Sequence, residues 1–164
     1  MEYLLEKDDI KIYPLSLAEL KDIVAEASEY TFAEGVIDET SLYPIKLKIG
    51  MMDTLDASLH PWFTYWAIYL TAEKTIIGLI GFKGLQDNTA EVGYGTAKGY
   101  RKKGYMYTAS ELLFGWAFEN GLEEITAQTE KQNTASIRLL EKVGMVEVGE
   151  VDGLLSWKMV RTIG

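Results

Sequence analysis

The stretch from Lys98 to Met106 has the residue types of a site for a phosphorylated ligand. It contains four basic side chains, no acidic one, and two glycines, Gly99 and Gly104. It lies between a predicted strand and a predicted helix, where backbone N–H groups have no acceptors within the helix and the helix dipole adds partial positive charge. The main chain there can hold a diphosphate where glycine leaves room for it. A solvated basic turn is the alternative that charge alone leaves open.

Two other phosphate-binding motifs fit the chain less well. The two glycines of this loop have the spacing of a P-loop, but Tyr105 and Met106 occupy the positions of its Lys and Ser/Thr. Gly93 and Gly95 lack the third glycine of a dinucleotide motif and lie within a predicted strand. The sequence therefore disfavours ATP and dinucleotides as ligands of these glycines.

The elements that must position the loop follow from apolar periodicity and turn residues. We expect strands at 10–14, 62–70, 75–82, 90–96, 124–129, 145–150 and 154–160, and helices at 16–25, within 38–59, at 107–120 and at 133–143. The strands at 62–96 form an antiparallel meander, and Gly93 and Gly95 indicate a bulge or the close approach of a ligand. Strands that alternate with helices predict an α/β (α+β) fold with a mixed sheet.

Composition predicts one globular domain over residues 1–164, since 48% of the residues are apolar and 25% are charged. The chain has no cysteine and one histidine, His60, which excludes disulfides, a thiolate zinc site, a cysteine nucleophile and a multi-histidine metal site. It contains neither a secretory-type start nor a run of about 18 apolar residues, so we expect a cytoplasmic protein without membrane association.

Acidic residues are concentrated in the first third of the chain. Residues 1–60 hold 5 Lys/Arg and 13 Asp/Glu, whereas residues 61–164 hold 11 and 12, and the net charge is -9. Such a charge repels nucleic acid backbones and favours cationic partners, although surface carboxylates commonly serve only solubility.

Two motifs resemble those of the GNAT acetyltransferase superfamily, especially its branch of bacterial ribosomal-protein N-acetyltransferases. The family pattern Arg/Gln-x-x-Gly-x-Gly/Ala is matched at Arg101 and Gly104, with Met106 in the last position. Downstream, Asn133 and Ser136 resemble the family's Asn-x-x-Ser/Ala helix, although Asn133 is also a good N-cap and Ser136 an ordinary first-turn serine. Together with the order of elements, the resemblance covers most of the chain.

The resemblance implies a mixed, mostly antiparallel central sheet flanked by helices, with acetyl-CoA bound at a splayed strand pair and no metal. The residues that it places at the cofactor are Tyr94, Gly95, Thr96, Arg101, Lys102, Lys103, Gly104, Tyr105, Met106, Asn133 and Ser136. In the family, the asparagine meets the pantetheine arm and its helix supports the thioester.

Acetyl transfer to an amine needs a base for the amine, a donor that polarises the carbonyl and an acid for the leaving thiolate. Glu91 is the first candidate for the base. A main-chain N–H near Tyr94 and Gly95 can polarise the carbonyl. The competing carboxylates are Glu147, Glu150 and Asp152, and Glu91 can also be an ordinary edge residue.

The acid is less well defined, because Leu140 stands where many family members have a tyrosine. Ser136 then takes the role of the acid, with Tyr105 or Tyr107 as alternatives. We expect direct attack by a primary amine in a ternary complex, with a protein N-terminus or a small cationic amine as acceptor, and a monomer or homodimer that binds no nucleic acid. A catalytically silent acetyl-CoA sensor and an interaction domain without CoA are the competing hypotheses.

Overall fold

The computed structural model describes residues 3–162, and within them the strands form one eight-stranded sheet in the order β1-β2-β3-β4-β5-β6-β8-β7. The strands are β1 (Leu5–Lys7), β2 (Ile10–Pro14), β3 (Tyr65–Leu70), β4 (Thr75–Phe82), β5 (Thr89–Thr96), β6 (Glu124–Glu130), β7 (Val146–Val151) and β8 (Leu154–Val160). All neighbouring strands of this sheet are antiparallel except β5 and β6, which are parallel. The parallel pair thus joins two antiparallel halves.

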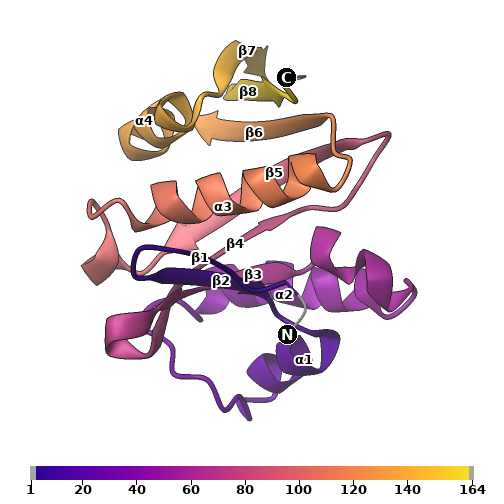
Figure 1. Cartoon of the computed structure of the whole chain (residues 1–164), viewed down its shortest axis with the longest axis vertical. Helices are drawn as coiled ribbons and strands as arrows, with labels where there is room; N and C mark the ends of the chain where they lie inside the picture. Colours follow the sequence, from indigo (N-terminus) through magenta and orange to yellow (C-terminus); the bar gives the residue numbers. More distant parts are fainter. Residues whose placement is uncertain (1–2, 163–164) are drawn as a thin grey trace.

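Helices cover both faces of the sheet. They are α1 (Leu17–Val24), α2 (Glu39–Met52), α3 (Tyr105–Glu119) and α4 (Thr134–Val143), with short 3-10 turns η1 (Ala57–Trp62), η2 (Thr71–Glu73) and η3 (Lys98–Tyr100). Figure 1 shows α1 and α2 at the end of the molecule opposite α4 and β6–β8, with α3 between them. No helix within residues 3–162 is both long and apolar enough to span a membrane.

Alternating strand residues divide the core into two clusters. Trp66 and Ile68 of β3 pack in the cluster that includes residues of α3 and α4, whereas Ala67 belongs to the cluster that includes residues of α1 and α2. Because successive side chains of a strand point to opposite faces, the two clusters lie on opposite sides of the sheet. Each side of the sheet therefore has its own helical cover.

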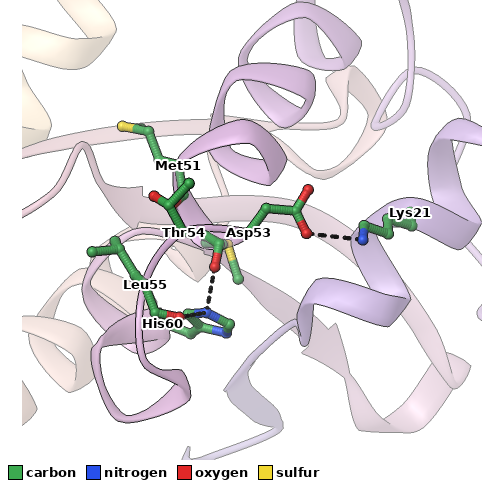
Figure 2. Close-up of polar contacts among 7 residues, drawn as sticks. Lys21, Met51, Asp53, Thr54, Leu55 and His60 are labelled. Carbon is green, nitrogen blue, oxygen red and sulfur yellow. Dashed lines mark hydrogen bonds and ion pairs between the residues drawn. The ribbon is translucent and has the colours of Figure 1, made fainter.

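Local hydrogen bonds fix the helices of the α1/α2 side. Ser16 and Glu19 form the predicted capping box at the start of α1. At the end of α2, His60 Nε2 lies 2.9 Å from the Met52 carbonyl oxygen and 3.1 Å from that of Leu55 (Figure 2). Since carbonyl oxygens can only accept, Nε2 carries the proton and donates to them. The single histidine, which lies in η1, therefore connects η1 to the end of α2.

The structure confirms most of the predicted elements and corrects four details. Trp62 ends η1, so the strand predicted from 62 begins at Tyr65. The helix predicted from 107 begins at Tyr105, and β1 was not predicted. The bulge at Gly93 and Gly95 was wrong, because β4 and β5 keep one register throughout their pairing.

Candidate functional site

Strands β5 and β6 separate after three paired residues. Their parallel pairing runs from Thr89 with Glu124 to Glu91 with Thr126. Beyond it, β5 continues to Thr96 and β6 to Glu130. The two strands therefore open a gap in the middle of the sheet, and Glu91 is the last residue of β5 before it.

Backbone groups of β5 point into this gap. The Ala97 N–H donates to the Ile77 carbonyl and the Lys83 N–H to the Glu91 carbonyl, so the odd-numbered residues of β5 exchange hydrogen bonds with β4. Because antiparallel hydrogen bonds alternate along a strand, the N–H groups of the even-numbered Tyr94 and Thr96 point to the opposite edge. The expected donor is therefore at Tyr94, while the Gly95 N–H faces β4.

The basic loop leads from the end of β5 into α3. Gly104 occupies the N-cap position with φ 83°, and Lys102 has φ 63°. Within residues 3–162, the N–H groups of residues 102–107 donate no hydrogen bond; the first bond of the helix runs from the Thr108 N–H to the Gly104 carbonyl at 3.1 Å. Turns of this kind, at a helix start, present several N–H groups to one anion.

The side chains of the loop have different surroundings. Arg101 Nε donates to the Thr96 carbonyl at 3.0 Å, which braces the loop against β5. Lys102 and Lys103 are exposed, and no carboxylate of residues 3–162 forms an ion pair with either. The side chains of Tyr105 and Met106 pack against the core under α3. Met106, in the position where the family has a small residue, thus contacts the core with its side chain.

Helix α4 begins at the diverging end of β6, as α3 follows that of β5. Asn133 caps it by accepting a hydrogen bond from the Ser136 N–H at 3.2 Å. Burial raises the pKa of the Tyr94 hydroxyl, and the neighbouring Ser136 side chain opposes that rise. The gap is thus flanked by two helix N-termini, those of α3 and α4.

Comparison with known proteins shows the family to which the chain belongs. The sequence model of the acetyltransferase (GNAT) domain matches residues 12–146. The chain belongs to the GNAT family. The GNAT domain includes β5, the basic loop, α3, β6 and α4, which are the elements around the gap.

Individual relatives agree with this GNAT assignment. The uncharacterized N-acetyltransferase YjdG of Bacillus subtilis is 36% identical over 87 residues, which are 51% of this chain and 52% of the relative. The chain spans about half the length of the curated relatives that it matches. The ribosomal-protein-S5-alanine acetyltransferase of Vibrio fischeri has the same fold, with a TM-score of 0.72 and 17% identity over 96% of each chain. RimJ of Mycobacterium smegmatis, solved in complex with CoA-disulfide, gives a TM-score of 0.61 and 18% identity over 92% of this chain and 81% of that chain.

The side chain of Glu91 lies on the face of the sheet opposite α3 and α4. Ala90 and Val92 pack in the cluster under α3, so the side chain between them points to the other face. There, Glu91 Oε2 lies 2.5 Å from Lys83 Nζ. Glu91 thus lies where the gap begins, and its carboxylate forms an ion pair with the ammonium of Lys83.

The other candidate acids and bases lie elsewhere. Glu147, Glu150 and Asp152 belong to β7 or its turn, and β6 and β8 separate β7 from β5 by roughly 14 Å at ordinary strand spacing. Glu150 is also paired with Lys131 at 2.6 Å. Tyr107 donates to Glu111 on α3 at 3.2 Å. The structure therefore places Glu91, Tyr94 and Ser136 at the gap, with Glu91 on the sheet face opposite the one that α4 and Tyr94 share, and it places these alternatives elsewhere.

Sequence reasoning missed two lysines, one paired with Glu91 and one whose pKa is affected by the charge of that first lysine. One is Lys83. The turn at 86–89 could have predicted its position, because this turn sets the register of β4 and β5 and so places Lys83 opposite Glu91. The other is Lys48 of α2, whose residue is only 5% exposed. Lys48 Nζ donates to the Phe63 carbonyl at 3.0 Å and to the Phe82 carbonyl at 2.9 Å. No sequence pattern distinguished Lys48 from a surface lysine.

Lys48 is a buried ammonium without a carboxylate among its hydrogen-bond partners, and this has a consequence for stability. Burial, and secondarily the charge of Lys83, lower the pKa of Lys48 from 10.5 to about 8. Between these values the unfolded chain binds a proton at Lys48 and the folded chain does not, so stability from this group rises with pH. Below pH 8 both states are protonated and the folded state carries the full desolvation cost.

We compare the free energies of unfolding of the unmodified protein and of Lys48→Met. We predict that the difference, unmodified protein minus variant, increases by about 3 kcal/mol from pH 7.5 to above pH 10.5, because a pKa difference of one unit corresponds to about 1.4 kcal/mol. Urea unfolding of both proteins across this range measures it. Lys131→Met, which also replaces one lysine by methionine but at an exposed position, is the control for the change in composition. A flat difference for Lys48→Met would mean that folding leaves its pKa unchanged.

Proposed function

We propose that this chain transfers the acetyl group of acetyl-CoA to a primary amine by direct attack in a ternary complex. The observation that carries the proposal is the convergence, at the gap between β5 and β6, of three kinds of group. These are the unpartnered N–H groups at the start of α3, the gap-facing N–H groups of β5, and the Glu91 carboxylate. Membership of the GNAT family supports acetyl-CoA as the donor.

Each group has one task in this proposal. The N–H groups of residues 102–107 bind the diphosphate of CoA, and Lys102 and Lys103 add screened charge. The Tyr94 N–H polarises the thioester carbonyl, because it points into the gap and has no partner on β6. Glu91 takes the proton of the amine. Ser136, with Tyr94 beside it, supplies the proton for the leaving thiolate.

The acceptor is proposed to be a protein N-terminus or a small cationic amine. Glu91 lies on the sheet face that α1 and α2 cover, and the first 60 residues, which include both helices, carry the acidic excess. A cation is attracted to that side of the molecule. The fold shared with the ribosomal-protein-S5-alanine acetyltransferase of Vibrio fischeri supports the protein N-terminus as acceptor.

A binding experiment tests the donor. We predict that CoA and acetyl-CoA at about 100 times their dissociation constant raise the melting temperature by roughly 5–10 °C, since such a ligand adds about 2.7 kcal/mol to stability. ATP and NAD at the same concentration are the controls and should have much smaller effects. Unchanged melting in millimolar acetyl-CoA would contradict the proposed function.

A turnover experiment tests the transfer. Thiol release from acetyl-CoA is followed with a panel of peptides bearing free N-termini, polyamines and their N-acetylated counterparts. The proposal expects thiol release that depends on a free amine. CoA binding without release for any amine would instead identify a silent sensor.

A further inference from the structure

A lysine ammonium occupies the position at Glu91 that the proposed mechanism gives to the acceptor amine. Lys83 Nζ lies 2.5 Å from Glu91 Oε2, and the side chains are 61% and 31% exposed. An ion pair at such exposure contributes little stability, so the ammonium exchanges readily between this pair and free positions. An internal primary amine is therefore present at the proposed base.

We propose that Lys83 is a self-acetylation site, converted to Nε-acetyl-lysine by the chain's own transfer centre from acetyl-CoA. This inference rests on the proposed function, because it uses the same donor and the same base. It adds a substrate that belongs to the chain itself.

The surface beneath Lys83 allows its nitrogen to move toward the gap. Lys83 Cε lies 3.6 Å from the place where a Cβ on Gly93 would stand, so the lysine stem crosses β5 over a residue without a side chain. Gly95 lies two residues further along β5, roughly 7 Å from Gly93, and no atom lies within 4 Å of the position that its Cβ would take. Rotation of the flexible stem carries Nζ along this open strip, from Glu91 toward the Tyr94 N–H.

The chemical step is balanced with acetyl-CoA alone. The Lys83 ammonium transfers one proton to Glu91, which leaves a neutral amine. The nitrogen lone pair forms a bond to the acetyl carbonyl carbon while the carbon–sulfur bond breaks, and that electron pair leaves on sulfur. The proton shed by the new amide nitrogen balances the one taken up by the thiolate. The products are Nε-acetyl-Lys83 and CoA thiol.

Acetylation changes the charge at the site. The amide that replaces the ammonium is neutral, so the ion pair with Glu91 is lost and the carboxylate becomes open to a cationic acceptor. The unmodified lysine, in contrast, competes with such an acceptor for Glu91. Self-acetylation of Lys83 therefore removes an internal competitor.

The experiment uses a matched lysine within the same chain. Lys131 also forms an ion pair with a glutamate, at 2.6 Å from Glu150, and its side chain is 53% exposed, but it pairs at the far edge strand β7. The full chain is incubated with acetyl-CoA and no acceptor, and peptide mass spectrometry follows both lysines over time at several protein concentrations. We expect Lys83 to be acetylated on the order of 100-fold faster than Lys131, since a placed base contributes about 10²–10⁴-fold.

Two further results are expected if the reaction occurs within one chain. The rate at Lys83 should not depend on protein concentration, and Glu91→Gln should lower it to the rate at Lys131. The variant Lys83→Arg keeps a cation beside Glu91 but has no amine there. Its intact mass should therefore not increase during incubation with acetyl-CoA over the time in which Lys83 of the unmodified protein is acetylated. Equal rates at Lys83 and Lys131, or a rate at Lys83 that rises with protein concentration, would overturn self-acetylation within one chain.

The same preparation separates the two possible failures. If CoA binds and an external amine is acetylated while Lys83 is not, the inference is wrong and the proposed function stands. If CoA does not bind and no thiol is released, both are wrong.

Discussion

Replacing Gly104 by valine is expected to weaken CoA binding by about 10- to 100-fold. Gly104 has φ 83°, a conformation that costs a β-branched residue about 1–3 kcal/mol, and tenfold in affinity corresponds to 1.4 kcal/mol. Nothing lies within 4 Å of its Cβ position, so the new side chain would point into the space beside the free N–H groups. Calorimetric titration with CoA measures the loss.

Arg101→Ala is expected to cost less, only a few-fold. It removes one screened charge and the bond from Nε to the Thr96 carbonyl, but leaves the N–H groups of the loop in place. Gly99→Val is the matched control, because Gly99 lies in the same loop, has ordinary φ and has open space at its Cβ position. If Arg101→Ala lost as much affinity as Gly104→Val, the loop would act mainly as a basic patch.

Glu91→Gln is expected to lower turnover at neutral pH by about 10²–10⁴-fold, the usual contribution of a general base. Acetyl-CoA affinity should stay nearly unchanged, since the carboxylate contacts the amine and not the donor. The deficit should shrink as pH rises, because a free amine then loses its proton in solution. Rates of thiol release between pH 7 and 10, with one accepted amine, measure this dependence.

Two variants separate catalysis from structure at Glu91. Lys83→Met breaks the same ion pair while keeping the carboxylate, so a loss of turnover from the broken pair alone would appear in it as well. Ser136→Ala should reduce turnover without rescue at high pH, because protonation of the thiolate does not become easier there. A pH-independent deficit in Glu91→Gln, with a lower melting temperature, would assign Glu91 a structural role.

Elements with local signals could be predicted closely from the sequence. The capping box of Ser16 and Glu19, and the Asn133 N-cap with Gly144 at the other end of α4, lie within a few residues of the groups that they bond. Such bonds depend on nearby sequence alone. The basic loop before α3 was found for the same reason, since its glycines, charges and helix start are contiguous.

The arrangement of the gap could not be derived in this way. The end of β5–β6 pairing at Glu91 and Thr126 depends on segments far apart in the chain, and only the family resemblance indicated it. Gly93 and Gly95 indicated either a bulge or the close approach of a ligand; the strand is regular there, so the bulge was wrong, and the glycines leave one face of β5 open. Glycine alone does not distinguish these two uses.

Burial of Lys48 illustrates a second limit. Lysine is almost never fully buried, so its position on a helix predicts a solvated side chain. It is buried here because the carbonyls of Phe63 and Phe82, which end neighbouring segments, both accept from it. Unsatisfied backbone groups of distant segments have no signature in the sequence.

The short pairing between β5 and β6 also bears on the motions of the molecule. Three paired residues are the main-chain link between the two halves of the sheet, while α3 and the side chains beneath it bridge them. Packing without a hydrogen-bonded ladder resists bending less, so we expect low-frequency bending of the sheet to concentrate between β5 and β6. A molecule that lies in the gap and bonds to β5 restricts this flexing. The entropy lost in that way offsets part of its favourable contacts, and a second molecule that binds afterwards meets a framework that is already ordered.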